Sequence, residues 1–172
     1  MTAAGPPGGE PGLQRLRAEH GPAVLAFEHE NRGYFAASIS DRGDEFFAQF
    51  ADRFRALLVE QESGACAFYV VVAADGAILG RFNLYEVRDG SAELGYRVAE
   101  AAAGQGLATA TVRELCGLAA TRLGLHTLRA AVSHGNAGSR RVLAKAGFVP
   151  VGPADSARLG GKQGTLYQRS LT

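Results

Sequence analysis

The sequence predicts a single α+β domain (a mixed α/β fold) built on a mixed β-sheet, and three observations lead to this expectation. Three β-rich segments follow one another between residues 67 and 98, joined only by short turns, which is typical of an antiparallel meander. After residue 98 helical and β patterns alternate, as crossover connections do. The 172 residues, 47% of them hydrophobic, are enough for one sizeable core. We expect one domain over residues 13–172, after a flexible leader over residues 1–12 that lacks the features of a signal peptide.

The first half is expected to hold a short strand, two helices and the meander. Residues 13–18 favour the strand, and residues 21–31 have helical apolar spacing with Pro22 in the first turn. Asp41 or Asp44 can cap a longer helix. The apolar face of that helix comprises Phe46, Phe47, Phe50, Phe54, Leu57 and Leu58. The meander strands are expected at residues 67–73, 78–87 and 91–98, with turn sequences at residues 74–77 and 88–90.

The second half is expected to alternate helices and strands. A helix over residues 105–123 ends at Gly124, and a strand follows at residues 127–132. Asn136 can cap a further helix through Ala146, which Gly147 stops. The last strands are expected at residues 148–151 and 166–171, separated by a Gly-rich loop over residues 153–164.

The segment over residues 94–113 is typical of an anion-binding site. A short apolar strand pattern ends at residue 98, a small-residue loop follows over residues 101–106, and a helical pattern begins directly after it. The first turn of a helix has backbone N–H groups without intrahelical partners, and the helix dipole adds partial positive charge there. Gly104 and Gly106 allow close approach and backbone angles that other residues resist. We therefore expect the loop to bind a phosphate group.

Two common phosphate-binding motifs do not fit this loop. A P-loop needs Gly-x4-Gly-Lys-Ser/Thr, and Gly161-Lys162 is followed by Gln163. The dinucleotide fingerprint Gly-x-Gly-x-x-Gly has Thr109 at its sixth position here. It also needs an acidic residue about 20 positions later, and residues 115–154 contain no Asp or Glu. Both nucleotide motifs are therefore excluded.

Charge is unevenly distributed along the chain. Up to Glu114 there are 16 acidic against 10 basic residues, and beyond it one acidic residue against eight basic ones. The basic half beside the loop indicates a polyanionic small ligand or a solvated basic face, and the acidic half suits any cationic acceptor. Cys66 and Cys116 lack metal or disulfide spacing, so buried thiols are expected. With no membrane-length apolar segment, we expect a cytoplasmic protein with no metal and no nucleic-acid or membrane partner.

Two motifs resemble those of the GNAT acyltransferases. Ala92-Glu93-Leu94-Gly95-Tyr96 leads into Gly104-Gln105-Gly106, and residues 136–148 resemble the Asn-x-x-Ser … Lys-x-Gly-Phe signature of the RimJ/RimL branch. The resemblance implies the GNAT fold, a central, mostly antiparallel sheet of about six to seven strands, splayed between the fourth and fifth and flanked by about four helices. It also implies an acetyl-CoA-dependent N-acetyltransferase. Ala101 and Ala103 stand where relatives carry polar or basic residues, so the loop relies on its backbone.

By the same resemblance, acetyl-CoA is expected between the strands at residues 93–98 and 127–132, with its pantetheine arm along the first of them. The backbone N–H of Val98 is a candidate donor to the oxyanion. Glu93 is the candidate base, directly or through a water, with an ion pair to Arg97 as the alternative. Ser139 is the candidate that protonates the thiolate, with a hydrogen bond to the helix backbone as the alternative. The cofactor-binding residues are expected to be Tyr96, Arg97, Val98, Ala103, Gly104, Gln105, Gly106, Leu107, Ala108, Thr109, Asn136, Ser139, Arg140 and Lys145.

The amine acceptor is expected near the first two helices, where the family shapes its acceptor site. Glu28, Glu30 and Asn31 are candidates to receive a cationic amine, and Tyr167 can reach the pocket from the last strand. The acceptor is a protein N-terminus or a small amine such as an antibiotic or polyamine. A non-catalytic acyl-CoA-binding module is the alternative function. A homodimer is common in this branch.

Overall fold

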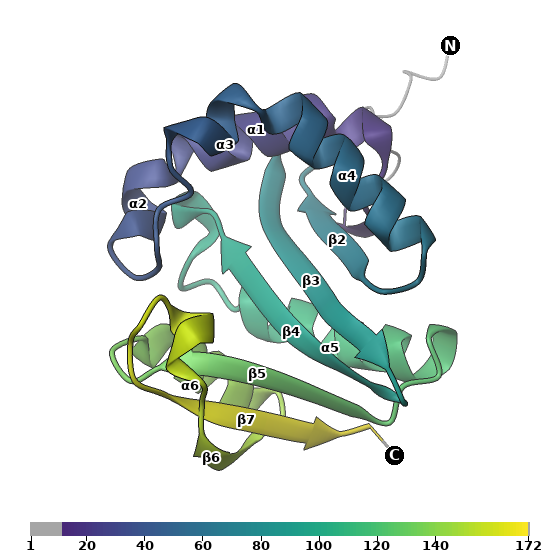
Figure 1. Cartoon of the computed structure of the whole chain (residues 1–172), viewed down its shortest axis with the longest axis vertical. Coiled ribbons are helices and arrows are strands. Elements are labelled where there is room, and N and C mark those ends of the chain that lie inside the picture. Colours follow the sequence, from purple (N-terminus) through teal and green to yellow (C-terminus); the bar gives the residue numbers. More distant parts are fainter. Residues whose placement is uncertain (1–11, 172) are drawn as a thin grey trace.

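The computed structural model describes residues 12–171, which form one seven-stranded sheet (Figure 1). Its strand order is β1-β2-β3-β4-β5-β7-β6. The strands are β1 (Gly12–Arg15), β2 (Ala67–Val72), β3 (Ile78–Arg88), β4 (Ser91–Val98), β5 (Thr127–Ser133), β6 (Val149–Pro153) and β7 (Gly164–Ser170). The leader expected over residues 1–12 lies outside the described residues except for Gly12, which begins β1.

The sheet opens between β4 and β5. These two strands form the one parallel pair among the described strands, and their register covers only Ser91↔Thr127, Ala92↔Leu128 and Glu93↔Arg129. Beyond Glu93 the strands diverge from a common end, as Figure 1 shows. The predicted mixed, mostly antiparallel sheet with a splay at its fourth and fifth strands is therefore confirmed.

Helices cover both faces of the sheet because each strand carries apolar side chains on alternate residues. On one face α1 (Gly21–Glu30) and α4 (Phe50–Glu62) pack on β2 through a core that includes Phe27, Phe54 and Phe68. On the other face α5 (Leu107–Arg122) and α6 (Ala137–Lys145) pack on β3, β4 and β5. In Figure 1, α1 and α4 arch over the top of the sheet and α5 lies behind it. Cys66 and Cys116 are free and buried in these cores, as predicted.

The helices before β2 differ from the expectation. The prediction of a single long helix is wrong, because the segment is divided at Gln49 into α3 (Asp44–Ala48) and α4. Neither aspartate caps it, because Gly43 occupies the N-cap and Asp41 instead pairs with Arg32. A short helix that was not predicted, α2 (Arg32–Ala36), follows α1 directly. Six α-helices are thus present in the described part of the chain, and none of them is long and apolar enough to cross a membrane.

Candidate active site

Two cavities meet in the gap between β4 and β5. The larger, here called the arginine-lined cavity, has a volume of about 540 Å³, and Arg42, Arg53, Arg97 and Arg158 are in its wall. The smaller, here called the loop cavity, has a volume of about 210 Å³ and extends to Ala102, Ala103 and Ala108 of the glycine loop. Both are lined by Ile39, Tyr96, Arg97, Asn136 and Ser139. A molecule in either cavity therefore ends at the same group of side chains.

The edge of β4 offers backbone hydrogen-bonding groups to this gap. Ala99 donates its N–H to Leu79 O at 2.8 Å, on the side of β3. Because hydrogen bonds on an antiparallel strand alternate between its two sides, the backbone groups of Tyr96 and Val98 point to the other side. There β5 has already diverged, so this edge can pair with an extended ligand.

The glycine loop reaches the loop cavity just before α5. A short 3₁₀ helix (Glu100–Ala102) precedes it, and Gly104 and Gly106 have φ of 73° and 79°, values that favour glycine. Gly106 is the N-cap of α5, so the N–H groups of Leu107, Ala108 and Thr109 form the unpaired first turn. Ala103 is different, because it donates its N–H to Glu100 O at 3.1 Å. The Ala103 N–H is therefore already used within the loop, while Ala103 lines the loop cavity and its place in the cofactor site stays a prediction.

Tyr96 and Ser139 form the junction of the two cavities. Their hydroxyl groups lie 2.7 Å apart, and Asn136 Oδ1 accepts the backbone N–H of Ser139 at 3.2 Å. Asn136 is thus the N-cap of α6, as predicted. The Ser139 side chain bonds to Tyr96 rather than to the helix backbone. Burial raises the pKa of Tyr96 to about 12, so the phenol stays protonated at neutral pH.

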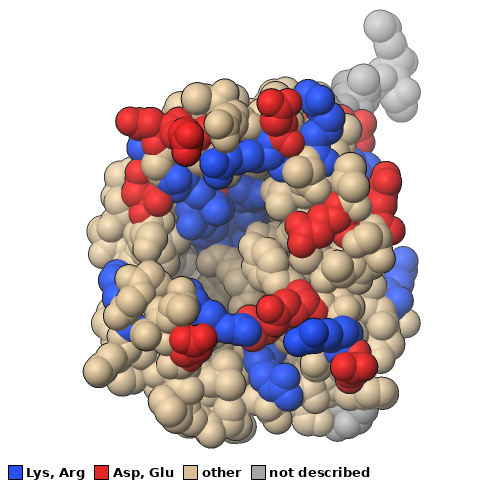
Figure 2. Space-filling view, viewed as in Figure 1, with Lys and Arg blue, Asp and Glu red and all other residues tan. Residues whose placement is uncertain are grey.

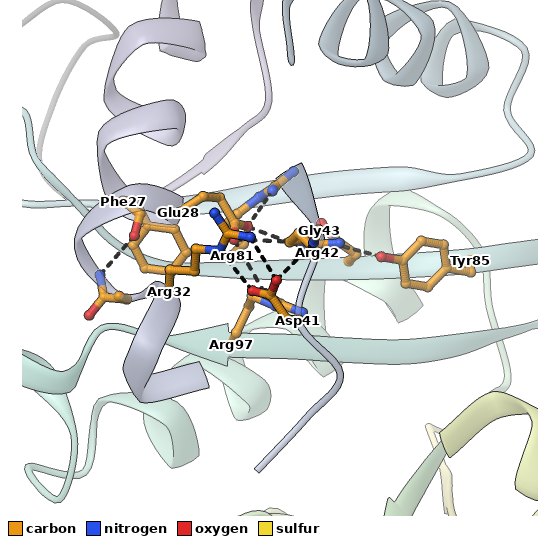
Figure 3. Close-up of polar contacts among 11 residues, drawn as sticks. Phe27, Glu28, Arg32, Asp41, Arg42, Gly43, Arg81, Tyr85 and Arg97 are labelled. Carbon is orange, nitrogen blue, oxygen red and sulfur yellow. Dashed lines mark hydrogen bonds and ion pairs between the residues drawn. The ribbon is translucent and has the colours of Figure 1, made fainter. Parts of the chain in front are cut away.

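A buried carboxylate surrounded by three guanidinium groups lies behind the arginine-lined cavity (Figure 3). Glu28 of α1 is only 1% exposed and bonds to Arg81 at 2.8 Å, to Arg42 at 3.1 Å and to Arg97 at 3.2 Å. Burial acts to raise the pKa of Glu28, but the Arg42 and Arg81 guanidiniums hold it below its ordinary value. Glu28 is therefore ionised and neutralised by its partners.

The wall of the arginine-lined cavity is basic and polar. Arg42 and Arg97 reach it from the cluster around Glu28, while Arg53 comes from α4 and Arg158 from a 3₁₀ turn (Ser156–Leu159). Figure 2 shows this hollow in the face of the molecule, with Lys and Arg side chains gathered on its upper wall. Asn83 Nδ2 donates to Tyr85 Oη at 2.9 Å, while the buried Asn83 Oδ1 has no partner among the described residues.

Glu93 lies next to this cavity rather than in it. It belongs to the paired part of β4 and forms an ion pair with Arg158, not with Arg97. It lines a neighbouring shallow cavity, and Tyr85 and Arg158 border both cavities. Contact between Glu93 and a ligand in the arginine-lined cavity therefore requires a bridging water.

Several other predicted residues lie away from the junction. The two polar side-chain atoms of Asn31 are used within the fold, because Nδ2 donates to Phe27 O and Oδ1 accepts the N–H of Glu100. Glu30 is exposed at the end of α1, and Tyr167 packs against the core on the α5 face. None of the three lines either cavity in the part of the chain that the structure describes. Arg140 and Lys145 are exposed on α6, beside the mouth of the loop cavity that Gly138 and Val142 line.

The polar face of β3 was not predicted from the sequence. Arg81, Asn83 and Tyr85 alternate with the buried Phe82 and Leu84, and they share a face with Arg97 because Arg81 pairs with Arg97. Three polar residues at a spacing of two, in the middle strand of a meander, could have marked a site within the sheet. No group of three His, Cys, Asp or Glu side chains within residues 12–171 is arranged to hold a metal ion.

Comparisons with known proteins agree with this architecture. Residues 12–149 match the family model of the acetyltransferase (GNAT) domain. A probable N-acetyltransferase, YjcK of Bacillus subtilis, is 30% identical over 130 residues, which are 72% of each chain. Two solved structures share the fold. One is a ribosomal-protein-S5-alanine acetyltransferase from Vibrio fischeri (TM-score 0.83, 20% identity, 92% and 91% of the two chains). The other is Mycobacterium smegmatis RimJ in complex with CoA-disulfide (TM-score 0.82, 24% identity, 95% and 83%). The chain therefore belongs to the GNAT family of acetyltransferases.

Proposed function

We propose that this N-acetyltransferase takes an acetyl group from acetyl-CoA in the loop cavity and transfers it to a primary amine in the arginine-lined cavity. The observation that carries the proposal is that the two cavities share Tyr96, Ser139 and Asn136. Two molecules that end at one place can react directly, because their reacting atoms are held together. Direct attack therefore needs no acetylated residue of the protein.

The residues around the loop cavity are suited to bind coenzyme A. The N–H groups from Gly104 to Thr109 would bind the pyrophosphate, and the β4 edge at Tyr96–Val98 would pair with the pantetheine amides. Arg140 and Lys145 are exposed cations that can meet the 3′-phosphate, and Gln105 closes the loop by donating to Ala101 O at 3.0 Å. Acetyl-CoA supplies the acetyl group as a thioester. The CoA compound in the RimJ structure supports this assignment.

Two groups at the junction can stabilise the charges that develop. The Val98 N–H points into the gap and is our candidate donor to the oxyanion. Ser139 Oγ is our candidate donor to the departing thiolate, and the Tyr96 hydroxyl at 2.7 Å can return a proton to it. The high pKa of Tyr96 means that it is available as a protonated donor.

The attacking amine must first lose a proton. Glu93 remains our candidate base, acting through a water between Tyr85 and Arg158, because these two residues border both its cavity and the arginine-lined one. The surrounding arginines assist this step, because nearby positive charge lowers the pKa of a bound ammonium.

Thermal unfolding and thiol release test the proposal. CoA and acetyl-CoA should raise the unfolding midpoint, and NAD should not, because only a ligand of the folded state stabilises it. Acetyl-CoA with a panel of primary amines should then release free thiol. A midpoint that neither CoA compound shifts at millimolar concentration would exclude both this function and a binding module. A shift without thiol release for any amine would favour a non-catalytic acyl-CoA-binding module. This module is the second candidate function, because Ala101 and Ala103 stand where relatives carry polar or basic residues.

A further inference from the structure

We infer that the acceptor is an amine that also carries a carboxylate, such as an amino acid or the acidic N-terminus of a peptide, and not a polyamine. This inference rests on the proposed function, and it names the chemical class of the substrate in the arginine-lined cavity. The charge of that cavity, its guanidinium groups and Asn83 in its wall support this class of acceptor.

The cluster behind the cavity has more positive than negative charge. Arg42, Arg81 and Arg97 surround the single carboxylate of Glu28, which leaves a formal charge of +2. Burial and the neighbouring Arg42 lower the pKa of Arg97 to about 10, and burial lowers the pKa of Arg81 as well. Buried charges need partners. The cluster therefore has room for a further anion, and Arg42 and Arg97 are the members that face the cavity.

The carboxylates near the cavity do not compensate this charge. Asp41 is the one acidic residue in the wall among the described residues, and Arg32 already binds it at 2.8 Å. Glu86 and Glu93 both pair with Arg158. Arg53 donates to Gln49, a neutral side chain, at 3.2 Å. A polyamine would thus meet repulsion from Arg42, Arg53 and Arg97 and find no free carboxylate in the described wall.

The two facing guanidiniums are held in fixed orientations. Arg97 lies over the Phe35 ring at 4.9 Å and Arg42 over the Phe46 ring at 5.0 Å. A guanidinium has five N–H donors in one plane and matches a carboxylate well. Among the described residues, Arg97 uses one donor on Glu28 and Arg42 uses two. The remaining donors are oriented before a ligand arrives, which lowers the entropic cost of binding.

Asn83 supplies the complementary group for the amine. Asn83 is in the cavity wall, its Oδ1 is buried without a partner within residues 12–171, and its Nδ2 donates to Tyr85 Oη. An unpaired buried oxygen is costly unless a ligand donates to it. Asn83 is two residues from Arg81 on β3, on the face that also carries Arg97. A small ligand whose carboxylate lies at the arginines would therefore have the Asn83 side chain in the wall of the same cavity.

Matched substrates test the inference. Thiol release from acetyl-CoA would be measured with L-leucine, L-leucinamide and isopentylamine, and with L-phenylalanine, L-phenylalaninamide and phenethylamine. The peptides Ser-Glu-amide and Ser-Gln-amide test a side-chain carboxylate, and spermidine tests a polycation. The carboxylate member of at least one set should have a kcat/KM at least tenfold above its neutral or cationic counterparts. Equal values, or spermidine as the best acceptor, would overturn the inference and leave the proposed function intact.

Variants locate the carboxylate. Arg42→Gln should lower kcat/KM at least tenfold more for the preferred acid than for its amide, and Arg42→Lys should recover part of this difference. Arg55→Gln is the matched control, because Arg55 is 75% exposed on α4 and pairs only with Asp52 among the described residues.

If no amine is acetylated, the proposed function fails. Calorimetric binding of the same compounds to the CoA-loaded protein then decides the inference alone, and equal affinity for acid and amide would refute it.

Discussion

The hydroxyl groups of Tyr96 and Ser139, 2.7 Å apart, join β4 to the first turn of α6 across the gap in the sheet. The two residues come from opposite sides of the splay and are 43 positions apart in the sequence. Tyr96 is held on one side by stacking on Phe82 at 5.3 Å, and Ser139 is held by the Asn136 cap. Contacts within the protein therefore hold both side chains at the junction.

Removing the Ser139 hydroxyl should slow the reaction without preventing cofactor binding. Ser139→Ala removes our candidate donor to the departing thiolate, and we expect kcat to fall about 10- to 100-fold, at the low end of the usual range for proton transfer by a side chain. The KM for acetyl-CoA should change less than threefold. Steady-state thiol release measures both quantities. An unchanged kcat, or a loss confined to KM, would assign Ser139 a structural role in α6.

Replacing Glu93 tests the base. Glu93→Gln keeps the size of the side chain but removes its ability to accept a proton, so kcat/KM should fall about 100-fold at neutral pH. Glu86→Gln is the matched control, because Glu86 also pairs with Arg158 and its loss removes the same charge. The control should retain more than half of the activity. Similar losses in both variants would mean that only the charge around Arg158 matters.

Adding charge to the glycine loop should strengthen cofactor binding. Ala101 is exposed beside the loop, so Ala101→Arg can reach a pyrophosphate without disturbing the core. An exposed ion pair between the added guanidinium and a phosphate contributes about 0.2–1 kcal/mol, so the Kd for CoA should fall by up to about fivefold. The gain should disappear at high salt. Ala51→Arg adds the same charge on an exposed site of α4 and should leave the Kd unchanged.

Local sequence patterns predicted most of the fold. The residue spacing gave β4 with its observed bounds, and the predicted cap at Asn136 depends only on neighbouring residues. The division between α3 and α4 was not predictable in this way. Gln49 is a good helix former, yet its ψ of 15° interrupts the helix there. The five-residue helix α2 is too short to show an apolar repeat.

The two parts of the candidate site differ in how far the sequence could predict them. The glycine loop and its helix are contiguous, so their geometry could be inferred directly. The cluster around Glu28 joins residues 14, 53 and 69 positions away, and Arg81 meets Arg97 only through the register of β3 with β4. The net charge of a long segment also did not predict the charge of the cavity. The half up to Glu114 is net acidic, but it contains Arg42, Arg53 and Arg97, which line the cavity. The expected anionic site for a cation at Glu28 is therefore wrong.

The Glu28 carboxylate should be essential for stability. Glu28→Gln removes the one anion among three guanidiniums, and breaking a buried ion pair in this way costs about 3–5 kcal/mol of unfolding free energy. Glu30→Gln, an exposed neighbour on the same helix, is the control and should cost less than about 0.5 kcal/mol. Urea unfolding at neutral pH measures both. A loss below about 1 kcal/mol for Glu28→Gln would show that the arginines do not need this partner.

The contribution of Glu28 should also depend on pH in a defined direction. Its pKa in the folded protein is below the ordinary value of 4.5, because the three arginines outweigh the effect of burial. A carboxylate whose pKa is lowered by folding stabilises the protein fully above its unfolded pKa and loses that contribution as pH falls through its folded pKa. The difference in unfolding free energy between the wild type and Glu28→Gln should therefore be constant from pH 8 to 6 and shrink below pH 4.5. Urea unfolding of both proteins across this range measures it, and a difference that already shrinks between pH 8 and 6 would contradict the assignment.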